Sequence, residues 1–301
     1  MSLPTYAIVT PARNEERFIA RVLESVVGQT VHPVRWVIVS DGSTDQTDAI
    51  VANYAHAHSW IELLRVDRVS ERNFAGKAAA LHAGYARLRE LDFDAVAFLD
   101  ADLDFAPEYF AFLLDKLACD AALGLAGTPY VEPDLASYDF KFVSRDHVSG
   151  ACQLFRRSCY EQIGGYRVIA SGAIDSIIAI EARMMGWKTR TFTEMFLRHY
   201  RTMGTASSGP LRARFNAGMK DYAIGNHPLW EIARALYQMT LPPFLLRGAA
   251  ILSGYLWAFL SRQPRAVPVD VMCFYRREQM ERLKTFLCRR LHLKHVEESA
   301  C

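Results

Sequence analysis

Short apolar runs alternate with helical patterns through the first two-thirds of this sequence. Four strand-like runs occupy residues 6–10, 36–40, 61–66 and 95–99. The segments between them, at residues 16–27, 47–54 and 77–91, place apolar side chains at helical spacing. Because continuous apolar strands need cover on both faces, this order predicts an α/β fold with a mostly parallel sheet between helices.

The composition is that of a chain that can bury a large core. Of the 301 residues, 51% are hydrophobic and 12% aromatic, which excludes a disordered or low-complexity protein. Six cysteines without a C-x-x-C pair fit neither a disulfide framework nor a four-thiolate zinc site. No apolar leader pattern follows Met1, so we expect reduced thiols and chemistry on the cytoplasmic side.

The net charge of +2 is the sum of two opposite parts. Residues 1–197 carry 19 basic and 26 acidic side chains, a net of −7. Residues 198–295 carry 16 basic and 5 acidic side chains, a net of +11, and Glu297 and Glu298 beyond them bring the total to +2. The near-neutral total argues against a nucleic-acid binder. The basic part adjoins an apolar stretch and better matches an anionic membrane surface or a lipid diphosphate.

Polar loops follow three of the predicted strands, at residues 10–15, 41–45 and 100–102. Ligands bind outside the carboxyl ends of the strands in open α/β sheets, so these loops predict one shared site. Ordinary helix capping is the alternative for the Asp41 loop.

Asp100 and Asp102 follow a buried strand, where carboxylates need a cation or a solvated cleft. Such oxygens suit Mg²⁺ or Mn²⁺ held together with substrate phosphates. Residues 103–107, including Asp104, predict the start of the next helix.

The ordered set of motifs resembles the inverting family 2 glycosyltransferases, which have the GT-A fold. The resemblance covers about residues 5–200 and rests on residues 9–16, on residues 39–45, on Arg72 with Gly76 and Lys77, and on the D-x-D motif at residues 100–102. It implies that Asp41 meets the nucleotide base, that Asp102 binds the metal ion and that Asp100 lies near the ribose or the metal. The donor-binding residues that it implies are Thr10, Pro11, Arg13, Glu15, Asp41, Arg72, Lys77, Asp100 and Ala101.

The acceptor half matches the family less fully. Residues 150–157 and 164–166 are similar to the segment that lines the acceptor site. The family's acidic pair, whose second member is the catalytic base, corresponds to Ile174 and Asp175 here, so Asp175 stands without an acidic predecessor. We take Asp175 as the base, because a carboxylate must remove the proton from the attacking hydroxyl. The alternatives are that Asp175 caps a helix beginning near Ser176, or that Glu181, expected on a solvated helix face, is the base.

His199 falls where related enzymes have a histidine close to the metal or the diphosphate. The resemblance therefore implies that its neutral imidazole completes the coordination by Asp102 and Asp100. A structural role for this lone histidine is the alternative. The neighbouring Arg198 or Arg201 could contact phosphate oxygens through a bidentate geometry.

Past residue 200, two features bear on polymer synthesis and on membranes. Residues 279–283 resemble the Q-x-x-R-W motif of processive members but lack its Trp, which predicts a chance match and the transfer of single sugars. The apolar stretch 241–260 is interrupted by Arg247 and is too short to span a bilayer. It predicts either a core helix or an interfacial helix on a membrane surface.

Three other functions compete with glycosyl transfer. Residues 98–102 also resemble the D-x-D nucleophile loop of haloacid-dehalogenase-like phosphatases, although three strands precede them here. A nucleotidyltransferase should carry a Gly-rich loop after its first strand, whereas residues 11–15 contain no glycine. A nucleotide-sugar-binding protein without a catalytic base is the non-enzymatic alternative.

The sequence therefore predicts a GT-A catalytic domain over residues 1–205, followed by a basic helical extension over 206–301. The nucleotide-sugar half covers about residues 1–105 and the acceptor half about 106–205. The resemblance implies inverting, Mg²⁺- or Mn²⁺-dependent transfer of a sugar from a nucleotide-diphosphate donor to a hydroxyl. It further implies a saccharide or lipid-linked saccharide acceptor in cell-envelope or exopolysaccharide synthesis. We expect a cytoplasmic protein with peripheral contact to the inner face of the plasma membrane, and no nucleic-acid partner.

Overall fold

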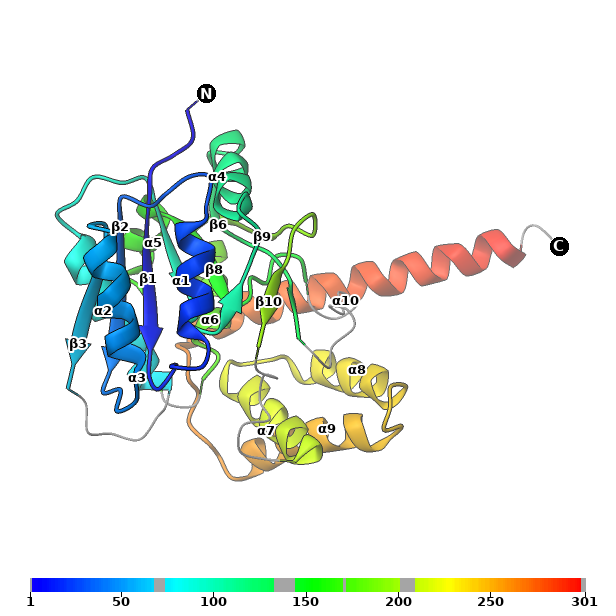
Figure 1. The fold of residues 1–301 in the computed structure, drawn as a ribbon. Helices are drawn as coiled ribbons and strands as arrows, with labels where there is room; N and C mark the ends of the chain where they lie inside the picture. Colours follow the sequence, from blue (N-terminus) through cyan, green and yellow to red (C-terminus); the bar gives the residue numbers. More distant parts are fainter. Residues whose placement is uncertain (1, 68–73, 133–143, 170–171, 201–208, 299–301) are drawn as a thin grey trace. The chain divides into compact units, whose positions relative to one another are not determined.

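The computed structural model describes residues 2–67, 74–132, 144–169, 172–200 and 209–298 (Figure 1). The chain divides into two compact units, Met1–Met203 and Gly204–Cys301. The first unit contains two β-sheets with their covering helices, and the second is built from helices.

A seven-stranded sheet forms the centre of the first unit, in the order β3-β2-β1-β4-β8-β6-β9. Its neighbouring strands pair in parallel, except that β8 runs antiparallel to both β4 and β6. The strands are β1 (Tyr6–Ala12), β2 (Arg35–Asp41), β3 (Ile61–Val66), β4 (Ala95–Leu99), β6 (Leu123–Gly127), β8 (Cys152–Arg156) and β9 (Lys188–Thr191). The predicted α/β fold with a mostly parallel sheet is confirmed.

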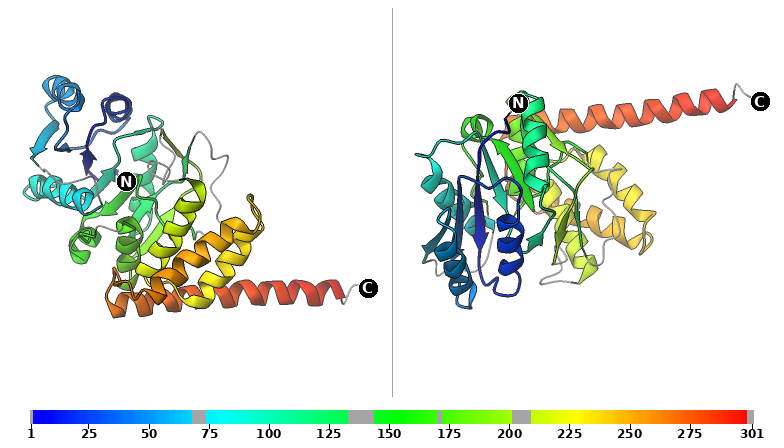
Figure 2. Two further views of the ribbon diagram at one scale, coloured as in Figure 1. Left: turned by 90° about the horizontal axis from the view of Figure 1, so that it is seen from below. Right: turned by 45° about the horizontal axis from the view of Figure 1, so that its top comes forward.

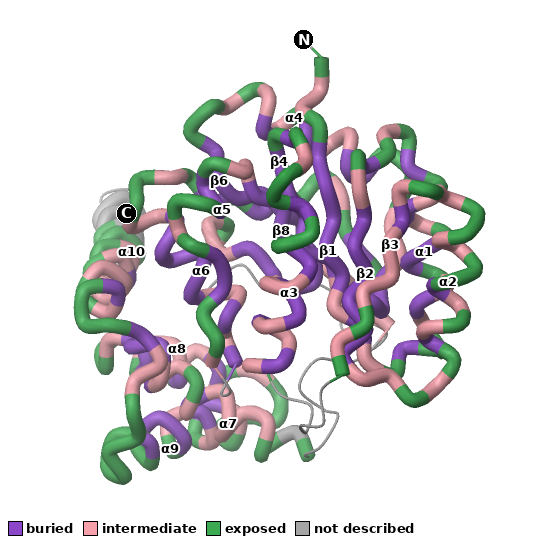
Figure 3. Tube along the Cα trace, turned by 90° about the vertical axis from the view of Figure 1, so that its left-hand side faces the viewer, coloured by how far each residue is buried: buried purple, intermediate pink, exposed green. Residues whose placement is uncertain are grey.

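Alternate residues of the strands enter two hydrophobic layers, one on each face of the sheet. Tyr6 and Ile8 of β1 pack with α1 (Ile19–Val27), α2 (Thr47–Ala57) and α4 (Tyr109–Cys119). Ala7 and Val9 pack with the opposite helices, which are α3 (Phe74–Leu88), α5 (Arg157–Ile163) and α6 (Ile174–Met184). Cover on both faces explains why the central strands are buried along their length (Figure 3).

A second, three-stranded sheet has the order β5-β10-β7. Its strands are β5 (Leu103–Asp104), β7 (Tyr130–Val131) and β10 (Leu197–His199). The expectation that residues 103–107 begin a helix is therefore wrong, because Leu103 and Asp104 pair antiparallel with β10 and α4 begins only at Tyr109. A partner strand more than 90 residues away decides the conformation of this segment, and no local pattern reveals that partner.

The second unit contains α7 (Pro210–Ala223), α8 (Pro228–Met239), α9 (Leu246–Leu260) and α10 (Val269–Glu298). The stretch 241–260 is not one helix, since Pro242 and Pro243 lie in the turn between α8 and α9 and cannot donate helical hydrogen bonds. In the described part of the chain, no helix is both long and apolar enough to cross a membrane. Within this unit α7, α8 and α9 lie together, whereas the C-terminal part of α10 extends away from them (Figure 2).

Hydrogen bonds give Gln279 of α10 a structural role. This residue, the first of the predicted chance match at residues 279–283, is only 1% exposed. Its side chain donates to Asn226 Oδ1 at 2.9 Å and accepts from the backbone N–H of His227 at 2.8 Å. Gln279 therefore joins α10 to the segment between α7 and α8.

Candidate active site

Three polar loops meet at the carboxyl edge of the large sheet. β1 is parallel to both β2 and β4, with Ala12 opposite Ser40 and Val9 opposite Phe98. Strands in this register end side by side, so the loops after them share one edge. Arg13 Nη1 lies 3.9 Å from Asp41 Oδ2, which joins the first two loops through opposite charges.

The first two loops also hold each other by reciprocal hydrogen bonds. Asn14 Oδ1 accepts from the backbone N–H of Thr44 at 2.8 Å. Asp45 Oδ2 accepts from the backbone N–H of Glu16 at 3.1 Å, and Glu16 Oε2 accepts from that of Gln46 at 3.0 Å. Asn14 has a left-handed backbone with φ of 54°, a conformation that asparagine tolerates better than most residues. The two loops thus form one preformed segment.

Several predicted donor-binding side chains are turned into the protein. The Thr10 hydroxyl accepts from the indole N–H of Trp36 at 2.9 Å, and both residues are fully buried. Glu15 is 3% exposed, and its backbone N–H donates to the Thr47 hydroxyl. Pro11 is half-buried and Ala101 is buried. Arg72 lies outside the described residues.

Asp100 follows β4 and forms a close ion pair with Lys77 of α3. The Lys77 Nζ and Asp100 Oδ1 atoms are 2.5 Å apart. Burial alone would lower the pKa of Lys77, but the charge of Asp100, with those of Asp175 and Asp102, raises it above its ordinary value. Lys77 is therefore a fixed cation at this edge of the sheet.

Asp175 lies in the same small cavity as this ion pair. The cavity lining includes Lys77, Asp100, Gly150, Tyr166 and Asp175. α6 begins at Ile174 after Ala173, whose φ is 61°, and no side chain caps it. The alternative that Asp175 merely caps a helix is thus wrong, and its side chain is available to the cavity.

Glu181 was expected on a solvated helix face, and this expectation is also wrong. The residue is 4% exposed, and its Oε1 lies 2.5 Å from Arg167 Nε. The ion pair with Arg167, whose own side chain is 41% exposed, explains why a charged side chain can occupy this inward position on α6.

Neighbouring residues leave Asp175 little freedom. Gln153 is fully buried, donates to the backbone carbonyl of Asp175 at 3.2 Å and accepts from the Tyr166 hydroxyl at 2.7 Å. A Cβ atom added at Gly150 would lie 3.0 Å from Asp175 Cβ and 3.2 Å from its Oδ2. Gly150 thus provides the room that the carboxylate occupies.

Replacing Gly150 with alanine is expected to displace the Asp175 carboxylate by a few tenths of an ångström. Because misplacement of a reacting group by about 1 Å can reduce the rate by about 10²-fold, we expect kcat to fall by about 10-fold or more. The affinity for donor should stay within about twofold, since the new methyl faces Asp175. Steady-state kinetics with donor titration checks both values. A G150A enzyme with unchanged kcat would show that the carboxylate position is not limiting.

Asp102 of the D-x-D turn and His199 of β10 lie close together. His199 Nε2 is 3.3 Å from Asp102 Oδ1, and Nδ1 is 3.4 Å from Glu132 Oε1. Burial alone would lower the pKa of His199, but the hydrogen bond and charge of Asp102 raise it. Glu132 was missed at the sequence level, because it belongs to no motif and meets His199 only through pairing of the small sheet.

Arg198 is exposed, and Arg201 lies outside the described residues.

These side chains fit a divalent cation by their chemistry. Within the described ranges, no group of three or more acidic, His or Cys side chains is arranged as a complete metal site. Asp102 and His199 nevertheless present a carboxylate oxygen and an imidazole nitrogen close together, both nearly buried. Two such donors suit Mg²⁺ or Mn²⁺ whose other positions are filled by phosphate oxygens and water.

Comparison with solved structures shows which proteins share this fold. The mannosyltransferase PcManGT from Pyrobaculum calidifontis, solved in complex with GDP-Man and Mn²⁺, superposes with a TM-score of 0.57 at 22% identity, over 94% of this chain and 81% of that chain. TarS 1–349 from S. aureus superposes with a TM-score of 0.55 at 15% identity, over 86% of this chain and 72% of that chain. The neighbours are GT-A glycosyltransferases, and the chain has their fold.

Sequence comparison shows a similarity to one family over part of the chain. Residues 7–141 match the model for glycosyl transferase family 2. The 4,4'-diaponeurosporenoate glycosyltransferase of Staphylococcus aureus (strain MRSA252) is 34% identical over 98 residues, which are 33% of this chain and 24% of that protein. The match thus spans about a quarter of the length of this curated relative. This similarity to glycosyl transferase family 2 is therefore confined to less than half of the chain, residues 7–141.

Proposed function

We propose that this chain is an inverting, metal-dependent glycosyltransferase that moves a sugar from a nucleotide-diphosphate donor to an acceptor hydroxyl. One observation carries the proposal: Asp175 lines the same cavity as Asp100 and Lys77. A carboxylate base therefore lies beside the groups that would receive the diphosphate. The fold neighbours solved with GDP-Man or UDP-GlcNAc support this donor class.

In this proposal Asp175 accepts the proton of the acceptor hydroxyl as its oxygen attacks the anomeric carbon. The bond between that carbon and the diphosphate oxygen breaks on the opposite face, so the configuration inverts. Lys77 faces the negative charge that develops on the leaving diphosphate. Asp102 and His199 would hold a bound Mg²⁺ or Mn²⁺, with Asp100 close by, and the cation would supply further positive charge.

The nucleoside end of the donor is assigned to the loops after β1 and β2. Asp41 is 7% exposed and lies beside Arg13, a position suited to polar recognition of a base. The backbone of residues 10–15 would enclose the nucleotide, and Arg72 remains a prediction for the basic group near it. The proposed domain division places these loops in the nucleotide-sugar half of residues 1–205.

Thermal-shift screening against UDP-, dTDP- and GDP-sugars with Mn²⁺ tests the donor class. A stabilising sugar nucleotide should then be consumed in the presence of an acceptor extract, and NMR of the purified product should show the inverted anomer. A product that retains the donor configuration would contradict the assigned role of Asp175. Stabilisation without turnover would instead support the non-catalytic binding alternative.

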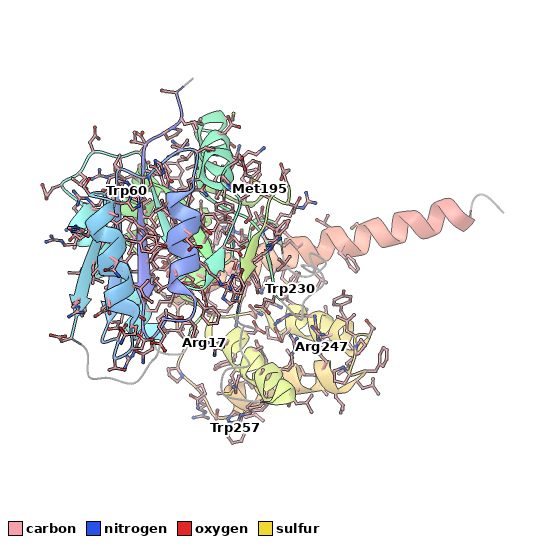
Figure 4. The ribbon with its side chains drawn as sticks, in the orientation of Figure 1. Arg17, Trp60, Met195, Trp230, Arg247 and Trp257 are labelled. Atoms are coloured by element: carbon pink, nitrogen blue, oxygen red, sulfur yellow. The ribbon has the colours of Figure 1, made fainter. Side chains whose placement is uncertain are left out.

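We further propose that the helical unit rests on an anionic membrane that carries a lipid-linked acceptor. Exposed apolar side chains gather on α8, on the turn after it and on α9, and we call them the apolar hairpin surface. Its members are Leu229, Ile232, Leu236, Phe244, Leu245, Leu246, Trp257 and Leu260, each between 44% and 75% exposed. Trp257 projects from α9 in Figure 4.

The charges around this surface suit acidic lipid. Residues 227–268 contain four arginines but a single acid, Glu231, which is fully buried. Within residues 227–268 no exposed acidic side chain therefore opposes approach to an anionic bilayer, and a group of exposed apolar side chains is typical of an interaction site. Placement at the inner face of the plasma membrane would bring the protein to the membrane that carries a lipid-linked saccharide.

Replacing both Phe244 and Leu245 with glutamate is expected to weaken binding to vesicles of phosphatidylglycerol and phosphatidylcholine by about 10-fold or more. Two apolar groups that would enter the lipid become charged, and the new charges repel the anionic headgroups. Co-sedimentation measures the bound fraction, and Val34→Glu in the first unit is the matched control, expected to bind as the wild type does. Equal binding of both variants would exclude this surface as the membrane contact.

A further inference from the structure

His199 lies between two carboxylates because of the pairing in the small sheet. β10 is its central strand, with His199 opposite Leu103 of β5 and Arg198 opposite Val131 of β7. Asp102 immediately precedes β5 and Glu132 immediately follows β7. Each ring nitrogen of His199 therefore faces a different carboxylate.

The imidazole of His199 is buried beside Glu132 and Tyr130. The side chains of His199 and Glu132 are both 5% exposed. Nδ1 makes no hydrogen bond with the described residues, and Glu132 Oε1 is the acidic oxygen at ion-pair distance from it, 3.4 Å away. The ring of Tyr130 lies against the imidazole with a centroid separation of 5.8 Å.

A neutral imidazole has one N–H group and one lone pair, on different nitrogens. If Nδ1 carries the proton toward Glu132, the lone pair of Nε2 faces the side on which Asp102 lies. Metal-binding histidines commonly donate their other N–H to a carboxylate, which fixes the tautomer and the ring orientation. At His199, Glu132 Oε1 lies 3.4 Å from Nδ1, in the place that such a carboxylate occupies.

We infer that Glu132 is a positioning residue that accepts the Nδ1 proton of His199 and keeps Nε2 directed to the cation beside Asp102. The inference rests on the proposed function for the cation alone and does not depend on the donor sugar or the acceptor. Glu132 acts through His199 and does not itself touch the substrate.

Titration of the full-length protein with MnCl₂ in the presence of GDP, and separately of UDP, tests this role, with free Mn²⁺ followed by electron paramagnetic resonance. Glu132→Ala is expected to weaken Mn²⁺ binding by about 10- to 100-fold. Glu132→Gln keeps an acceptor oxygen and is expected to stay within about threefold of the wild type. Glu194→Ala removes an exposed carboxylate near β10 that pairs with Lys116, and it is expected to leave Mn²⁺ binding unchanged.

A double-mutant cycle separates positioning from a general structural effect. In a His199→Ala background, Glu132→Ala should produce no further loss of Mn²⁺ affinity. An equal loss in both backgrounds, or wild-type affinity in Glu132→Ala, overturns the inference. If Glu132→Ala does not fold, Glu132→Met replaces it, since methionine fills a similar space without an acceptor oxygen.

The wild-type titration keeps the two proposals distinguishable. A wild type that binds no Mn²⁺ with either nucleotide would overturn the metal part of the proposed function and this inference with it. A wild type that binds Mn²⁺ while Glu132→Ala binds it equally well would overturn the role of Glu132 alone.

Discussion

Replacing Asp175 with asparagine is expected to reduce sugar transfer by about 10³-fold, within the range of about 10² to 10⁴ typical for loss of a general base. Asparagine has the shape of aspartate but cannot accept the proton of the acceptor hydroxyl. Gln153 holds the backbone carbonyl of Asp175 and Gly150 leaves room for the side chain, so the substituted side chain should keep its place in the cavity. The affinity for the donor, measured by calorimetry, should change by less than about threefold while kcat collapses.

Glu181→Gln is the matched comparison, because Glu181 is the other carboxylate on α6 and is buried. It pairs with Arg167. We expect this variant to lower the melting temperature by leaving Arg167 without its anion, while the folded enzyme keeps its kcat. If Glu181→Gln abolished turnover and Asp175→Asn did not, the base would be Glu181. Unchanged kcat in both variants would remove a carboxylate base on α6 from the reaction.

Chelation of divalent cations is expected to lower transfer to below about 1% of its starting rate, with recovery on addition of excess Mn²⁺ or Mg²⁺. A diphosphate leaving group carries charge that a bound cation neutralises, and this is worth several kcal/mol in related chemistry. Asp102→Asn should likewise reduce kcat by about 10²-fold or more, since a neutral amide binds hard cations poorly.

Asp104→Asn provides the control for this second prediction. Asp104 lies two residues beyond Asp102, but its carboxylate accepts a hydrogen bond from the Tyr200 hydroxyl. An asparagine oxygen can accept the same bond, so transfer and its response to Mn²⁺ should stay near the wild-type values. Full activity in EDTA would refute the metal requirement, and equal losses in Asp102→Asn and Asp104→Asn would mean general damage to the turn.

Four strands of the large sheet and the three polar loops could be predicted because their signals are local. Strands 6–12, 35–41, 61–66 and 95–99 are apolar and end at polar loops, and the parallel pairing of β1, β2 and β4 then follows from the alternation with helices. The proline pair at residues 242 and 243 is also a local signal. It indicates a break in the helix that outweighs the apolar run around it.

The remaining features depend on contacts between distant segments. β5 is a strand only because β10 pairs with it, and Glu132 reaches His199 only because β7 lies on the other side of β10. The space that Gly150 leaves for Asp175 is likewise a property of two segments packed together. Residue type and spacing do not indicate contacts between distant segments. Neither Glu132 nor the role of Gly150 could therefore be predicted from the sequence.

The hydrogen bonds between the loops after β1 and β2 affect the rate and the entropic cost of donor binding. Asn14, Glu16 and Asp45 already occupy fixed positions through their backbone partners. A ligand that enters such a preordered segment immobilises little additional chain, so less of its interaction energy is lost to ordering. Association at the nucleoside end should therefore be a single fast step, without a slow isomerisation of these loops in stopped-flow traces.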